Sequence, residues 1–112
     1  MFTLNDISPF LLSTAKENFT ASEVDFNSAR DSALEIIKSK VAIDPELPFP
    51  KSLILPAAWI AGYLNVQTSS SINPDEQGRY ETLYNRALKM LNDLTVKSTN
   101  YSIVEIKGVH QW

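Results

Sequence analysis

Residues 53–66 read LILPAAWIAGYLNV, a stretch that is apolar on nearly every side when it is wound into a helix. A helix without a polar face has to be surrounded by other elements, so this segment predicts the central, most buried helix of the fold. It falls well short of the ~20 apolar residues that a membrane-spanning helix needs. Small residues, among them Ala61 and Gly62, would let neighbouring helices approach closely, and Pro56 either begins the helix or kinks it.

A second helix is expected directly downstream, after a polar, serine-rich loop over residues 67–72. Asn73 and Pro74 are residue types of an N-cap and a first helical position, and Asp75 and Glu76 suit the positive end of a helix dipole. Apolar residues then recur every three or four positions, at Tyr80, Leu83, Tyr84, Ala87, Leu88, Leu91 and Leu94. This stripe predicts an amphipathic helix.

An amphipathic helix is also expected upstream, from about Ser22 to Val41, because apolar residues recur there at the same spacing with charged residues between them. Ser22 is its expected N-cap. Residues 44–50 then carry three prolines, which remove backbone donors and disfavour helix. They predict a fixed, extended connector between two helices.

The N-terminal residues allow two different helix starts. Ser8 and Pro9 fit the N-cap and first position of a short helix that runs toward Ala15. Alternatively, Thr3 with Asp6 three residues later resembles a capping box, and the helix would then begin before Pro9.

The end of the chain has a different pattern, because β-branched residues dominate residues 101–107 and predict one strand. A lone strand cannot satisfy its own backbone groups, and no second strand is apparent, so we expect it to pair with a neighbouring subunit or protein. The final tryptophan is either an anchor in a partner's pocket or part of a disordered end. The expected partner-binding residues are Tyr101, Ile103, Val104, Ile106, His110 and Trp112.

These elements together predict a mostly α fold, a small bundle of about four helices with an extended C-terminal strand or tail. The chain has 112 residues, of which 44% are hydrophobic, which suffices for one core and not for two. We expect a helical domain over residues 1–98 and an extended C-terminal arm over residues 99–112.

The sequence offers little catalytic equipment, so we expect no enzyme, no metal and no cofactor. There is no cysteine, and His110 is the only histidine, without an acid or second histidine at a ligand spacing. Three glycines are too few for a phosphate-binding loop. Acid pairs such as Asp31 with Glu35 fit a solvated helix face better than an acid and base pair. Aromatic residues at helical spacing, including Tyr80 and Tyr84, predict core packing rather than a ligand pocket.

The charge distribution argues against direct binding of nucleic acid. The net charge is −3, and 13 acids are interspersed with 10 bases along the chain, so no basic stripe forms. The first residues have neither the basic nor the apolar region of a signal peptide, and we expect no secretion and no membrane association.

The order and spacing of these segments resemble the head-tail connector (adaptor) proteins of tailed bacteriophages, and the Mu-like prophage connector group in particular. The resemblance is carried by the amphipathic segment 29–37, the Leu-Pro-Phe-Pro connector at 47–50, the alanine-rich helix 53–64 and the helix 80–94, and it covers roughly residues 1–97. It rests on order and hydrophobic pattern, because this family has no invariant catalytic signature.

The resemblance implies a structural virion protein that forms a twelve-fold ring beneath the portal and joins the DNA-filled head to the tail. Its implied partners are further copies of itself, the portal protein and a tail or stopper protein, with DNA only as passing cargo in the lumen. The implied location is the virion neck, and the host cytoplasm during assembly. Three alternatives stay open: a small helical protein-binding or regulatory module, a small enzyme or ligand-binding bundle, and a tail-completion or stopper component.

Overall fold

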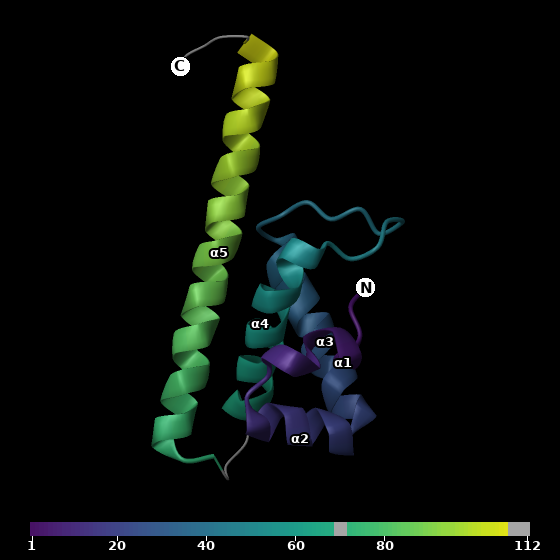
Figure 1. The fold of residues 1–112 in the computed structure, drawn as a ribbon, viewed down its shortest axis with the longest axis vertical. Coiled ribbons are helices and arrows are strands. Elements are labelled where there is room, and N and C mark those ends of the chain that lie inside the picture. The colour runs from purple at the N-terminus through teal and green to yellow at the C-terminus, as the bar shows by residue number, and fades with distance from the viewer. Residues whose placement is uncertain (69–71, 108–112) are drawn as a thin grey trace.

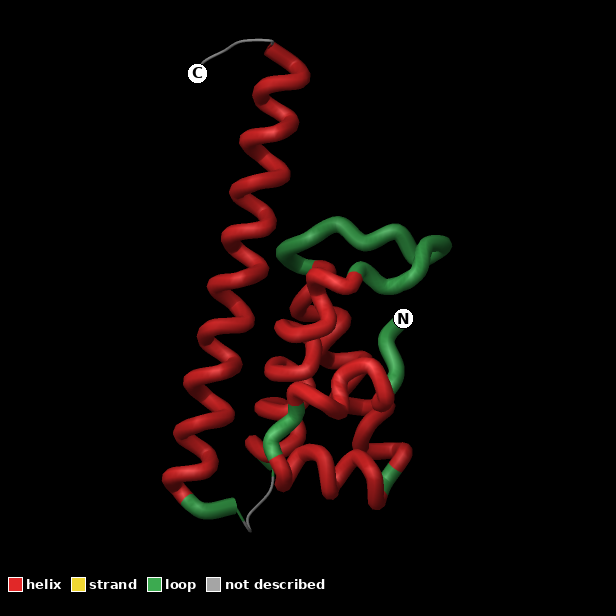
Figure 2. Tube along the Cα trace, in the orientation of Figure 1, coloured by secondary structure: helices red, strands yellow, loops and turns green. Residues whose placement is uncertain are grey.

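The computed structural model describes residues 1–68 and 72–107, with side-chain positions described as far as residue 94 within that second range. The described chain is mostly helical, as the sequence predicts, and Figure 2 shows only helices and loops among these residues. The elements in chain order are α1 (Leu4–Ile7), the 3-10 turn η1 (Ser8–Phe10), α2 (Ser13–Ala21), α3 (Glu23–Lys38), the 3-10 turn η2 (Lys51–Leu53), α4 (Ile54–Gln67) and α5 (Pro74–Lys107).

The molecule is elongated, with principal extents of 54 × 31 × 20 Å. Helix α4 stands in the middle of the bundle, with α5 along one side and α3 along another (Figure 1). Helix α2 lies across the base, and α1 packs against α4 (Figure 1). The long loop between α3 and α4 lies at the end of the bundle opposite α2 and the start of α5, and it extends outward from the bundle (Figure 1).

The N-terminal helix uses the second of the two predicted starts. The Thr3 hydroxyl accepts a hydrogen bond from the Asp6 N–H, and the Asp6 carboxylate accepts one from the Thr3 N–H at 2.8 Å, which is a complete capping box. The alternative, a short helix capped by Ser8 that runs toward Ala15, is wrong, because Ser8 and Pro9 belong to η1, which ends at Phe10. Leu11 is extended at its end, and a separate helix, α2, then begins at Ser13.

The expected helix from Ser22 is confirmed as α3. The Ser22 hydroxyl accepts a hydrogen bond from the Asp25 N–H, as an N-cap does. The connector that follows is free of helix from Ser39 to Pro50, in agreement with its prolines. It is not extended throughout, because hydrogen-bonded turns lie at its start and at Asp44–Leu47.

The connector is held to the bundle by aromatic contacts. The Phe49 ring lies edge-on to Phe2, with ring centroids 5.1 Å apart, and Phe2 also meets Phe26 of α3. Phe26 in turn contacts Phe19 of α2 at 5.6 Å in the same T-shaped geometry. Edge-to-face pairs of this kind stabilise by about 0.5–1.5 kcal/mol beyond the area they bury, so this chain of rings joins the N-terminus, α2, α3 and the connector.

The central helix is buried as its composition predicts. Pro56 is the third residue of α4, where no intrahelical N–H bond is lost, so it begins the helix rather than kinking it. The fully buried positions of α4 face α3 on one side and α5 on another. They are Pro56, Ala57, Ala58, Ile60, Ala61, Gly62 and Val66.

The expected strand at residues 101–107 is wrong, because α5 continues as a helix through Lys107. The sequence from Arg79 to Lys107 holds neither proline nor glycine, so helix propagation meets no breaker. β-propensity is a preference for a packed, pleated surface, and it has little effect where no strand lies alongside. The boundary of the expected arm at residue 99 stays a prediction.

Candidate functional site

The residues that the sequence singles out fall into two groups. Tyr101, Ile103, Val104 and Ile106 belong to the last turns of α5 rather than to a strand. His110 and Trp112 lie outside the described residues. The structure therefore assigns the first four a helical backbone, and their role in partner binding stays a prediction.

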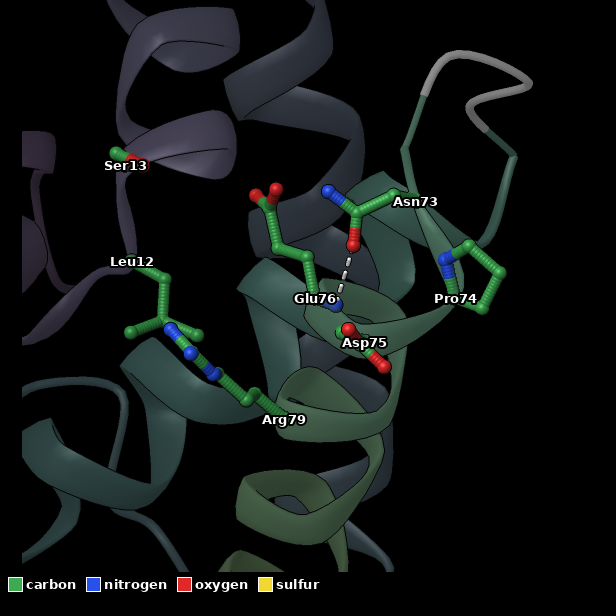
Figure 3. A pocket seen from close by; sticks show the side chains of 7 residues that line it. All are labelled: Leu12, Ser13, Asn73, Pro74, Asp75, Glu76 and Arg79. Atoms are coloured by element: carbon green, nitrogen blue, oxygen red, sulfur yellow. Dashed lines mark hydrogen bonds between the residues drawn. The ribbon is translucent and has the colours of Figure 1, made fainter.

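The best-defined polar cluster lies elsewhere, where the start of α5 meets the start of α2. Asn73 caps α5 as expected, since its side-chain oxygen accepts a hydrogen bond from the Glu76 N–H at 2.8 Å (Figure 3). The Glu76 carboxylate in turn accepts a hydrogen bond from the Thr14 hydroxyl of α2. The first turn of α5 is thus fastened to the first turn of α2.

One turn further along α5, Tyr80 makes the second link between the two helices. Its hydroxyl accepts a hydrogen bond from the Ala15 N–H at 2.9 Å, and both residues are buried. Helix α2 has no side-chain cap of its own at Leu12, so Tyr80 satisfies one of the donors that a helix start leaves free. Burial raises the pKa of the Tyr80 hydroxyl, the Glu76 carboxylate raises that pKa further, and the bond from Ala15 opposes the rise.

A groove opens beside this junction. Its first part, about 520 Å³, has Leu12 and Ser13 on one wall and the beginning of α5 on the other, and the Arg79 side chain extends toward Leu12 (Figure 3). Its second part, about 580 Å³, continues along α5 and shares Leu12, Asp75 and Arg79 with the first. We call this second part the α5 groove; it is lined by Leu12, Asp75, Gly78, Arg79, Thr82, Leu83 and Arg86.

The α5 groove combines an apolar floor with positive charge. Leu12 and Leu83 are half-buried, and Arg79 and Arg86 are exposed. Neither arginine forms an ion pair with any residue whose side chain the structure describes. Asp75 lines the same groove, so it holds two arginines and one acid beside its leucines. Arginine is enriched at protein-binding surfaces, and this composition suits such a surface.

The sequence reading did not identify this groove, because Leu12 and Leu83 come from distant parts of the chain. It placed Tyr80 and Tyr84 in the core. The structure confirms this for Tyr80, which is buried, whereas Tyr84 is partly buried, packs against the core and stacks on Tyr63 with centroids 4.3 Å apart. The polar role of Tyr80 was missed. The signal that could have revealed this role is general: the hydroxyl of a buried tyrosine usually has a hydrogen-bond partner.

The described residues contain no group of three or more histidines, cysteines or acids placed to hold a metal ion. No helix in the part of the chain searched is both long and apolar enough to cross a membrane. Comparison of the chain with protein-family models, with curated proteins and with solved structures found no match.

Proposed function

We propose that this chain is a structural adaptor of the head-tail connector type, which forms a ring beneath a phage portal and joins the head to the tail. It would act in the virion neck after assembly in the host cytoplasm, with the portal protein and a tail or stopper protein as partners. DNA would pass through the lumen as cargo. The sequence resemblance motivates this proposal, and the shape of the molecule supports it.

The supporting observation is the length and position of α5. It spans 34 residues, about 50 Å at 1.5 Å per residue, whereas α4 spans only 14. Figure 1 shows the C-terminal turns of α5 rising beyond the bundle, with no other described helix alongside them. Isolated helix is marginal in water, so a helix that leaves its bundle is expected to gain stability from another component of an assembly.

The overall shape also suits a ring. An elongated block of 54 × 31 × 20 Å can be placed side by side with copies of itself, so that every α5 projects from the same face. In a closed ring each copy meets its neighbour through two different surfaces, related by rotation. A net charge of −3 would keep the ring from adhering to DNA that slides through it.

The proposal is tested by mixing the purified chain with the portal protein from the same genome. Light scattering gives the mass of each species, and electron microscopy shows whether a ring stacks on the portal. We expect a stable complex with ring density beneath the portal for the full chain. We expect no complex for a chain that ends at Thr99, because it lacks the last turns of α5.

Matched controls separate folding from binding in this test. The circular dichroism and the urea midpoint of the truncated chain report whether its bundle is intact, since Leu91 is the last buried residue of α5 among the side chains described, and the truncation keeps it. A full-length chain that neither forms rings nor binds the portal would overturn the proposal. It would leave the small helical protein-binding or regulatory module as the better reading.

A further inference from the structure

The α5 groove contains a glycine for which the chain itself shows no need. Gly78 is the fifth residue of α5, and a Cβ added there would meet no atom within 4 Å. Glycine inside a helix costs about 0.5–1 kcal/mol relative to alanine, so its presence has to be explained by something else. A common reason is the close approach of another molecule to the backbone. Gly78 leaves the middle of the groove open, between Asp75 at one end and Arg86 at the other.

The opposite side of the molecule carries a surface of complementary composition. Leu47 is 62% exposed, one of few large apolar side chains so exposed among the residues described. Asp44 and Glu46 flank it, both exposed, and neither forms an ion pair within the described part of the chain. The turn therefore presents one leucine with two acids, and the groove presents two leucines with two arginines and one acid, Asp75, at its end.

The turn is also preorganised. The Leu47 N–H donates to the Asp44 carbonyl at 3.2 Å, and the Glu46 N–H donates to the Asp44 carboxylate at 2.9 Å. Pro45 and Pro48 restrict the backbone on either side. A segment that is already held in shape loses little conformational entropy when it binds, so it is suited to insertion into a groove.

We propose that the α5 groove of one copy binds the Asp44–Pro48 turn of the next copy, with Leu47 against Leu12 and Leu83 and the acids toward Arg79 and Arg86. The turn lies in the α3–α4 loop, at the end of the bundle opposite the start of α5 (Figure 1), so the turn and the groove of one chain lie at opposite ends. Such a contact is head-to-tail and repeats from copy to copy. The inference rests on the proposed function, because it supplies the subunit contact of the proposed ring.

Because the chain contains no cysteine, a disulfide in a crosslinking test can form only between the cysteines that are introduced. A full-length variant with Leu47→Cys and Thr82→Cys is mildly oxidised and separated without reductant. We expect a ladder of covalent multimers that collapses to monomer on reduction. The matched control is Val24→Cys with Thr82→Cys, because Val24 is also strongly exposed, at 75%, but lies on α3. The Leu47 pair is expected to form its ladder about tenfold faster than the control, because docking raises the local concentration of the thiols.

Two further variants, and one control variant, test the groove itself in the chain that carries Leu47→Cys and Thr82→Cys. Arg79→Glu with Arg86→Glu is expected to reduce the rate to that of the control pair, and Lys89→Glu, on the same helix outside the groove, is expected to leave it unchanged. Gly78→Gln fills the open middle of the groove; it is expected to slow crosslinking to the control rate while the urea midpoint stays equal or rises. Equal rates for the Leu47 and Val24 pairs would overturn the inference.

These outcomes are distinguishable from those of the portal experiment. A fast Leu47 ladder without portal binding would keep the head-to-tail contact and overturn the connector role. Rings on the portal together with equal crosslinking rates would keep the connector role and overturn this contact.

Discussion

The hydroxyl of Tyr80 accepts a hydrogen bond from the backbone N–H of Ala15, 65 positions earlier in the chain, at 2.9 Å. Because α2 has no side-chain cap, this bond replaces a local cap with one from the other end of the sequence. The position at which α2 begins is thereby coupled to the docking of α5. The α5 groove, which we propose as a subunit contact, lies beside this junction and shares Leu12 at the start of α2 with it.

Replacing Tyr80 by phenylalanine is expected to lower the free energy of unfolding by about 1–3 kcal/mol, because the Ala15 N–H would be left buried without an acceptor. Urea denaturation measures the loss. Tyr84→Phe is the matched control, since the Tyr84 hydroxyl makes no hydrogen bond with the described residues, and its effect should stay within about 0.5 kcal/mol. Equal effects of the two variants would contradict the capping role of Tyr80.

The raised pKa of Tyr80 predicts a pH dependence of stability on the alkaline side. The unfolded chain releases this proton near the ordinary value of 10.0, whereas burial holds it to higher pH in the folded state. The contribution to stability is therefore complete below pH 10.0 and is lost as pH rises through the folded-state pKa. Urea midpoints measured from neutral pH to beyond the tyrosine range should fall less steeply for Tyr80→Phe than for the wild type. Parallel curves would show that Tyr80 makes no such contribution.

The bond between the Thr14 hydroxyl and the Glu76 carboxylate should appear as coupling in a double-mutant cycle. Thr14→Val and Glu76→Ala are expected to couple by about 0.5–1.5 kcal/mol, because each removes the same hydrogen bond. A cycle that pairs Glu76→Ala with Thr20→Val is the control, since the Thr20 hydroxyl bonds only locally, to the Lys16 carbonyl. If the effects are additive in both cycles, the bond between Thr14 and Glu76 does not stabilise the contact between α2 and α5.

Gly62→Ala is expected to be tolerated although Gly62 is buried. An added Cβ would lie 3.4 Å from the Tyr80 ring and 3.5 Å from Leu11, which are ordinary contacts. Higher helix propensity should raise the free energy of unfolding by up to about 1 kcal/mol. Gly62→Val adds two methyl groups to a filled space and should lower it by about 1–3 kcal/mol. Thermal unfolding of the two variants checks the sign, and a clear loss with alanine would mean that the Gly62–Tyr80 contact is tighter than described.

Two of the helix starts could be predicted from the sequence alone. Ser22 and Asn73 were predicted as N-caps, and each accepts the expected hydrogen bond from a backbone N–H three residues later. The capping box at Thr3 and Asp6 was one of two predicted helix starts. The other start, at Ser8 and Pro9, lies so close to it that the sequence pattern did not decide between them. Helix α2 was not predicted as a separate element, because it lacks a cap of its own.

The C-terminal part of α5 shows the opposite case. β-branched residues near Ile103 favour a strand when judged alone, but they follow a helix that contains no breaker after Gly78. Local propensity is a small effect, on the order of tenths of a kcal/mol per residue, so the continuity of an established helix outweighs it.

The sequence alone determined the mostly helical class, the buried central helix and the capped starts of α3 and α5. Each of these follows from residues within a few positions of one another, through helical periodicity and side-chain caps. Only the tertiary structure decided where α2 begins and that Leu12 and Leu83 share one groove with Arg79 and Arg86. Those relationships join residues from the two ends of the chain, and they exist only once α5 has packed along α4 and across the start of α2.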